Sequence, residues 1–297
     1  MGIFRSELCD PTEINLNIDF SLSRESCYDS LMVTSRGGIG FIVFRHGTEQ
    51  EWLRTNNDQI GFALTKTVLE ANKDSVYVNI GAWAGDTTIF GARYAKKTVA
   101  VEANPYTFDH LKYNVELNQA HIGDVLLEHA YLSDQDATAN ICIPFHPLSR
   151  ATCGEDRKCE RLELNRQQKR PENFTEVQVP GMSITSLYTK YTLQNITLLK
   201  IDIEGGECNL FGENSQGTLQ PVDQLLLELH PFLFAKEEFM DYIASLLPIR
   251  SILPHSILFD KNGQVIHSFD DIVPDRDHQF LLASKKPFDS SIKQLFS

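Results

Sequence analysis

The residues best suited to chemistry lie in two short segments, each an apolar run that ends in polar side chains. In the first, Asp202 and Glu204 follow the run 198–201, and their alternation predicts that both point to one face of a strand. In the second, Glu228 and His230 alternate in the same way. If the two strands are neighbours, the four side chains converge. They could then deprotonate a hydroxyl, or bind a divalent cation through Asp202, Glu228 and His230.

Two of the polar residues near these strand ends also have a purely structural interpretation. His230 could be a hydrogen-bonded core histidine. Glu207, which follows the glycine pair after Glu204, could simply complement the positive end of a helix. The sequence leaves both interpretations open.

A glycine-bearing turn comes earlier in the chain, at the end of another apolar strand. Gly81 would let a ligand approach the backbone, and Gly85 would permit a tight turn into a helix whose first N–H groups face that ligand. Glu102 ends the following strand, 17 residues after Gly85. An acid about 20 residues past such a turn binds ribose hydroxyls in doubly wound sheets. Together the turn and the acid predict a ligand that contains adenosine.

This spacing alone fits both a dinucleotide and S-adenosylmethionine. Trp83 stands where the dinucleotide pattern GxGxxG places its second glycine, and its bulk would block the approach of a pyrophosphate. The chain also contains no Tyr-x-x-x-Lys pair of the kind used for hydride transfer. A nicotinamide-dependent oxidoreductase is therefore the weaker alternative.

The elements that must position these residues alternate between strand and helix from residue 59 onward. Such alternation predicts a mainly parallel α/β sheet with helices on both faces. The predicted strands are 75–80, 98–102, 124–132, 196–203, 224–229, 252–259 and 279–284, and the predicted helices include 87–95, 105–117, 183–191 and 237–247.

Three further segments complete the predicted organisation. Residues 32–34 and 40–44 flank a glycine pair and predict a β-hairpin. We expect residues 1–58 to form an N-terminal extension and residues 59–297 a single domain. Within that domain, the polar stretch 146–175 is predicted to be an inserted loop or lid.

Composition excludes several classes of protein. The chain has 27 Lys and Arg against 40 Asp and Glu, a net charge of −13, which argues against nucleic acid as a partner. No apolar run approaches the roughly 18 residues that suggest a membrane span. The N-terminus lacks a basic segment followed by an apolar core, so we expect a cytoplasmic protein. The six cysteines show no zinc spacing and are expected to be reduced thiols.

The motifs VNIGAWAGDT, VAVEANP, LLKIDIEGGE and LLLELH, in this order, resemble those of the FkbM-type S-adenosylmethionine-dependent methyltransferases. The resemblance runs from Glu70 to His230. It implies a class I methyltransferase fold, which is Rossmann-like with seven strands, the last antiparallel. It also implies S-adenosyl-L-methionine as cofactor and transfer to a hydroxyl of a sugar or secondary metabolite, so the acceptor would be a small molecule or glycan.

The resemblance further assigns individual positions. The cofactor would be bound by Gly81, Ala82, Gly85, Glu102, Asn104, Asp134 and Asp202, with the glycines at its methionine part, Glu102 at the ribose, and Asn104 and Asp134 near the adenine. Asp202 and Glu204 would lie beside the sulfonium and the acceptor. From the chemistry of the reaction we expect Asp202 and Glu204 to be the acidic pair, with His230 as base or third metal ligand. Asp202 could instead bind the amino group of the cofactor.

One position departs from the family pattern. Asn79 stands where the family usually has Asp, which removes a charge that often faces the cofactor. Asp86 could compensate for it. The substitution also keeps open the alternative of a catalytically weak or inactive binding module on the same fold.

Overall fold

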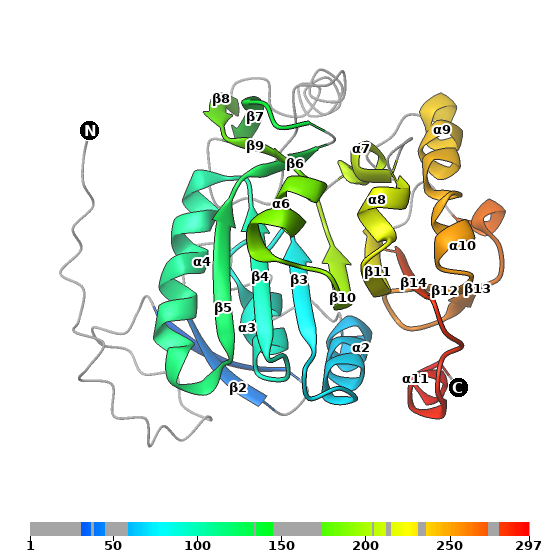
Figure 1. Ribbon diagram of the computed structural model, residues 1–297, viewed down its shortest axis with the longest axis horizontal. Coiled ribbons are helices and arrows are strands. Elements are labelled where there is room, and N and C mark those ends of the chain that lie inside the picture. The colour runs from blue at the N-terminus through cyan, green and yellow to red at the C-terminus, as the bar shows by residue number, and fades with distance from the viewer. Residues whose placement is uncertain are drawn as a thin grey trace.

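The computed structural model describes residues 31–36, 39–44, 59–133, 135–144, 174–203, 205–211, 215–230, 236–272 and 279–296. Their centre is an eight-stranded sheet in the order β13-β12-β14-β11-β10-β3-β4-β5 (Figure 1). The strands are β3 (Val76–Ile80), β4 (Lys97–Glu102), β5 (Asp124–His129), β10 (Ile196–Ile201), β11 (Val222–Leu229), β12 (His255–Asp260), β13 (Val265–Ile266) and β14 (Gln279–Ser284).

The strand directions confirm the predicted class I methyltransferase fold. The five strands from β5 to β11 run parallel, and β14, the last strand of the chain, is antiparallel to both of its neighbours. One detail differs from the predicted seven strands. After β12 the chain turns back, and Val265 and Ile266 pair with Phe259 and Leu258 as an eighth strand at the edge.

Helices cover both faces of the sheet, and alternate strand residues supply the two cores. One face packs against α2 (Gln59–Glu70), α3 (Asp86–Ala92), α4 (Pro105–Asn118) and α11 (Ser290–Gln294). The other packs against α6 (Ile184–Tyr191), α7 (Glu207–Phe211), α8 (Ser215–Leu219), α9 (Lys236–Leu246) and α10 (Ile249–Ile252). The described part of the chain also contains the 3₁₀ turns η2 (Gln119–His121) and η4 (Phe269–Asp271).

The helix that follows β4 begins at a capping asparagine followed by a proline. Asn104 lies in extended conformation, and its side chain accepts a hydrogen bond from the N–H of Tyr106, which caps α4. Pro105 stands in the first turn, where its missing N–H costs nothing. The start of α4 is thereby fixed immediately after Glu102.

A predicted hairpin precedes the sheet. The strands β1 (Leu31–Arg36) and β2 (Ile39–Phe44) pair antiparallel, as predicted, and β2 lies against α3 and α4. Residues 1–30 and 45–58 lie outside the described residues, so the division of the chain near residue 59 stays a prediction. No helix in the described part of the chain is both long and apolar enough to cross a membrane.

Two small strand pairs beyond the sheet were not predicted. The predicted strand 124–132 is interrupted at Ala130, whose N–H bonds to the Glu102 carbonyl, and β6 (Tyr131–Ser133) then pairs in parallel with β9 (Gly181–Ser183). In addition, β7 (Ala139–Pro144) pairs antiparallel with β8 (Phe174–Val179). The predicted insertion 146–175 therefore overlaps β8 by two residues, because 174 and 175 belong to that strand. Residues 145–173 lie outside the described residues.

Candidate functional site

Gly81 follows β3 and lies against Asp202, the residue that follows β10. Its φ is +81°, and a Cβ at this position would lie 1.7 Å from the carbonyl oxygen of Asp202. The expected clash is therefore with the neighbouring strand end rather than with a ligand. This glycine brings the turn after β3 into direct contact with the acidic end of β10.

Four N–H groups of this turn donate hydrogen bonds within the protein. They donate as follows: Gly81 and Ala82 to the Val101 carbonyl at 3.0 and 2.9 Å, Trp83 to Glu102 Oε2 at 2.8 Å, and Gly85 to the Ala82 carbonyl at 2.9 Å. A pyrophosphate is normally bound by free N–H groups at such a turn. With these donors engaged, the turn is better suited to a ligand that brings its own donors, such as an α-ammonium group.

A buried side chain supports the same turn from α4. The Nδ2 of Asn114 donates to the carbonyl of Ala84 at 2.7 Å. Trp83, one residue earlier, has a φ of +46°, a left-handed conformation that costs a non-glycine residue about 1–2 kcal/mol. The bonds around Trp83 hold its backbone in this conformation.

Glu102 lies buried at the end of β4 and binds three protein donors. Its Oε1 accepts from the N–H of Asn104 and the hydroxyl of Thr107, each at 2.9 Å, and its Oε2 accepts from the N–H of Trp83. Burial raises the pKa of this carboxyl above its ordinary value, against the lowering effect of these hydrogen bonds. Since a carboxylate oxygen can accept about two hydrogen bonds, Oε2 keeps capacity for one more donor.

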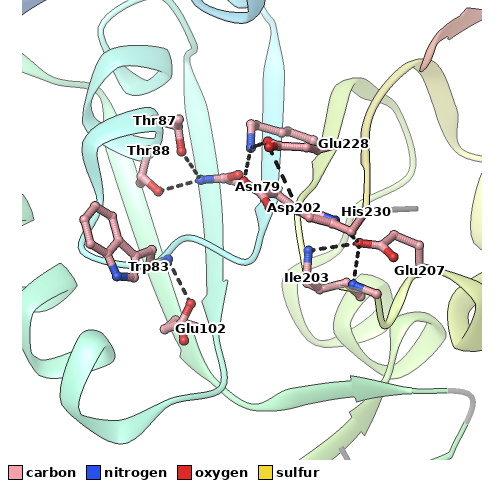
Figure 2. A network of polar contacts seen from close by, with 12 residues as sticks. Asn79, Trp83, Thr87, Thr88, Glu102, Asp202, Ile203, Glu207, Glu228 and His230 are labelled. Atoms are coloured by element: carbon pink, nitrogen blue, oxygen red, sulfur yellow. Dashed lines mark hydrogen bonds and ion pairs between the residues drawn. The ribbon is translucent and has the colours of Figure 1, made fainter. Parts of the chain in front are cut away.

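The remaining predicted cofactor residues lie in different settings. The side chain of Asn104 is buried and already used to cap α4. Asp134 lies outside the described residues. Asn79 is fully buried, and its Nδ2 donates to the hydroxyls of Thr87 and Thr88 at 3.0 and 2.8 Å (Figure 2). This asparagine therefore anchors the first turn of α3.

Three of the four side chains predicted to converge lie together at the two acidic strand ends. The strands β10 and β11 are parallel neighbours, with Ile201 opposite Leu227. One ligand atom each from Asp202, Glu228 and His230 lies within 4.8 Å of the others, close enough to share a cation. Glu204 lies outside the described residues.

His230 is fully buried between acids. Its Nδ1 lies 3.1 Å from Glu207 Oε1, and its Nε2 lies 3.5 Å from Asp202 Oδ1 (Figure 2). Glu207 Oε1 also accepts the N–H of Gly205 at 3.2 Å, and Tyr242 donates to Oε2 at 3.5 Å. Glu207 thus complements the turn before α7, as expected, and also orients the imidazole, which was not predicted.

Lys200 is the second residue of this cluster that was not predicted. Its side chain is only 4% exposed, and Nζ lies 3.1 Å from Asp202 Oδ2 and 4.0 Å from Glu228 Oε2. The signal was present in the sequence, because a lysine within the apolar run 198–201 must be paired if the strand is buried.

The members of this cluster differ in their access to solvent. The Asp202 side chain is 28% exposed, against 11% for Glu228 and none for His230. Asp202 is therefore the most solvent-accessible acid of the cluster, whereas His230 and Glu207 are fully buried.

Comparison with known proteins gives the family. The profile of the methyltransferase FkbM domain matches residues 75–256. No curated protein matched the sequence.

Two matches among solved structures have low sequence identity and TM-scores below 0.5. A putative SAM-dependent methyltransferase from Streptococcus mutans has 8% identity and a TM-score of 0.45, over 88% of this chain and 57% of that chain. The chain thus spans little more than half the length of that protein. An O-methyltransferase from Bacillus cereus in complex with SAH has 10% identity and a TM-score of 0.42, over 81% of this chain and 92% of that chain. The FkbM profile matches more than half of the residues of the present chain. The chain therefore belongs to the FkbM family of S-adenosylmethionine-dependent methyltransferases.

Proposed function

We propose that this methyltransferase transfers the methyl group of S-adenosylmethionine to a hydroxyl oxygen of a small molecule or glycan, such as a sugar or a secondary metabolite. The observation that carries the proposal is the convergence of Asp202, Glu228 and His230 directly beside the Gly81 turn. Such a cluster places proton acceptors at the point where a sulfonium would be bound.

The reaction needs a proton acceptor because an alcohol does not ionise unaided near neutral pH. The acceptor oxygen forms a bond to the methyl carbon as the carbon–sulfur bond breaks, and that electron pair stays on the sulfur. The hydroxyl proton passes to a base during the transfer. Asp202 is the most accessible candidate, and His230 Nε2 lies 3.5 Å from its Oδ1, which supports a shared proton-accepting pair. Glu204 remains a predicted partner of this pair.

A divalent cation is the alternative route to the same step. A cation held by Asp202, Glu228 and His230 would lower the pKa of a bound hydroxyl, and these residues lie close enough together to bind one. The two routes differ in their response to a chelator.

On the cofactor side, we assign the methionine part to Gly81, Ala82 and Gly85. The remaining acceptor capacity of Glu102 Oε2 supports one hydrogen bond from a ribose hydroxyl. Asn104 and Asp134 stay the predicted neighbours of the adenine.

Methyl transfer from labelled S-adenosylmethionine to a panel of hydroxylated sugars and metabolites tests the proposal. We expect labelled product with the wild type and a strong loss in Asp202→Ala and Glu204→Ala. Unchanged activity in both variants would refute the assigned roles. Insensitivity to a chelator would exclude only the cation route.

Calorimetric titration with S-adenosylmethionine, S-adenosylhomocysteine and NAD tests the two alternatives, an oxidoreductase and an inactive module that no longer binds the cofactor. We expect S-adenosylmethionine and S-adenosylhomocysteine to bind and NAD not to bind. Binding of NAD would favour the oxidoreductase. Failure to bind S-adenosylmethionine at millimolar concentration would favour an inactive module on the same fold.

A further inference from the structure

Lys200 carries a charge into the interior of the sheet. It lies on β10, opposite Asn79 of β3 and Leu226 of β11, and its side chain is 4% exposed. An ammonium group at such depth is stable only when anionic groups compensate for its lost hydration. Asp202 and Glu228 supply that compensation, with Nζ at 3.1 Å from the first and 4.0 Å from the second.

The same two carboxylates are the anionic part of the candidate cation set. Figure 2 shows Asp202, Glu228 and His230 turned toward one another beside Asn79. A divalent ion bound by Asp202 and Glu228 would share both carboxylates with the ammonium of Lys200. Two cations at such short separation repel each other strongly in a poorly solvated site. Lysine and metal therefore compete for the same pair of acids.

We propose that the Lys200 ammonium is the resident cation of this site, and that it positions Asp202 and Glu228 without a divalent ion. The part of the proposal that makes methyl transfer independent of metal rests on the proposed function. The part that concerns the interaction of Lys200 with the two carboxylates can be tested on the folded protein without methyl transfer. Lys200 is thus a positioning residue, acting through Asp202.

Thermal unfolding of the full chain with and without MnCl₂, at matched ionic strength, tests the proposal without any acceptor. We expect no manganese-specific shift in the wild type. Lys200→Met should lower Tm, because it leaves two carboxylates facing each other, and manganese should then raise Tm by several degrees, because binding to the folded state stabilises it. Lys200→Arg keeps the charge and is expected to show no manganese response. Asp202→Asn in the Lys200→Met background should abolish the response.

Two results would overturn the proposal. One is a manganese-specific rise in the Tm of the wild type that Asp202→Asn removes, and the other is a Lys200→Met variant that folds and ignores manganese. Should Lys200→Met fail to fold, electron paramagnetic resonance of Mn²⁺ mixed with the wild-type protein provides the test. A spectrum of free Mn²⁺ alone would support the proposal. Stoichiometric binding of Mn²⁺ that is lost in Asp202→Asn would refute it.

The proposed function can fail separately. Absence of methyl transfer to every hydroxyl tested would refute the proposed function, and the results with manganese would stay the same.

Discussion

The two halves of the candidate site are held in position by different means. On the proposed cofactor side, at the ends of β3 and β4, main-chain N–H groups bond to the Val101 carbonyl and to the buried Glu102. On the proposed acceptor side, at the ends of β10 and β11, the charged side chains of Lys200, Asp202 and Glu228 hold one another. In the first arrangement hydrogen bonds of the main chain hold the residues in position. In the second, attraction between charged side chains does so. Substitutions should therefore change cofactor affinity on one side and turnover on the other.

The largest effect is expected where the two halves touch. Gly81→Ala places a Cβ 1.7 Å from the Asp202 carbonyl oxygen and forces a left-handed conformation on alanine. We expect a loss of at least about 3 kcal/mol of unfolding free energy, measured by chemical denaturation. Gly217→Ala is the matched control, since its Cβ meets only a methyl group at 3.6 Å. Similar stability of the two variants would show that the halves are not in contact.

The next largest effect is expected on the acceptor side. Asp202→Asn keeps the shape of the side chain but removes its capacity to take a proton. We expect kcat to fall by about 100-fold to 10,000-fold, with little change in affinity for S-adenosylhomocysteine. Asp223→Asn, an exposed position on β11, serves as control. A loss of cofactor affinity that matches the loss of kcat would erase the proposed division between the halves.

Glu102→Gln tests the cofactor side. The variant removes the charge that binds three donors, so we expect cofactor binding to weaken by about 1.5–3 kcal/mol, with kcat preserved at saturating cofactor. Glu116→Gln, exposed on α4, is the control. Calorimetry with S-adenosylhomocysteine provides the measurement.

The raised pKa of Glu102 adds a pH dependence to that experiment. Because burial raises this pKa, the carboxylate takes up its proton at a higher pH than an ordinary glutamate as the solution is acidified. Protonation removes acceptor capacity, so affinity should decline on acidification in the wild type. Glu102→Gln should lack this decline, and a persistent decline would assign it to another group.

The smallest effect is expected for two asparagines of α4, of which one bonds to the Gly81 turn and the other bonds within the helix. Asn114→Ala removes the bond to the Ala84 carbonyl, and Asn118→Ala removes a bond to the Asn114 carbonyl in α4. Both should lose about 1–3 kcal/mol of stability. Only Asn114→Ala should also weaken cofactor binding, by about 1 kcal/mol or roughly fivefold. Equal affinity in the two variants would mean that the turn needs no support from α4.

Local pattern predicted most of the sheet and the meeting of its acidic ends. Apolar runs marked the parallel strands, and the alternation of Asp202 with Glu204 and of Glu228 with His230 placed the acids at their carboxyl ends. Parallel pairing then brings Asp202, Glu228 and His230 together without further information. The roles assigned to these residues stay predictions.

Contacts between distant segments could not be predicted in the same way. Glu207 and His230 are 23 residues apart and meet because β10 and β11 are neighbours, so that the first residue of α7 lies beside the residue that follows β11. The occupied N–H groups of the Gly81 turn depend on where Val101 and Glu102 lie in space. The strand β7 did leave a local signal, since Ile141 and Ile143 alternate and are both buried.

The pairing of β7 with β8 has a consequence for the chain between them. Pro144 and Phe174 are opposite each other in the ladder, so the two positions that flank residues 145–173 are adjacent. A segment anchored in this way can change in length at little entropic cost, because the penalty for closing a loop grows only slowly with its size. Segments of different length could therefore be inserted between β7 and β8 without any change in the register of this ladder.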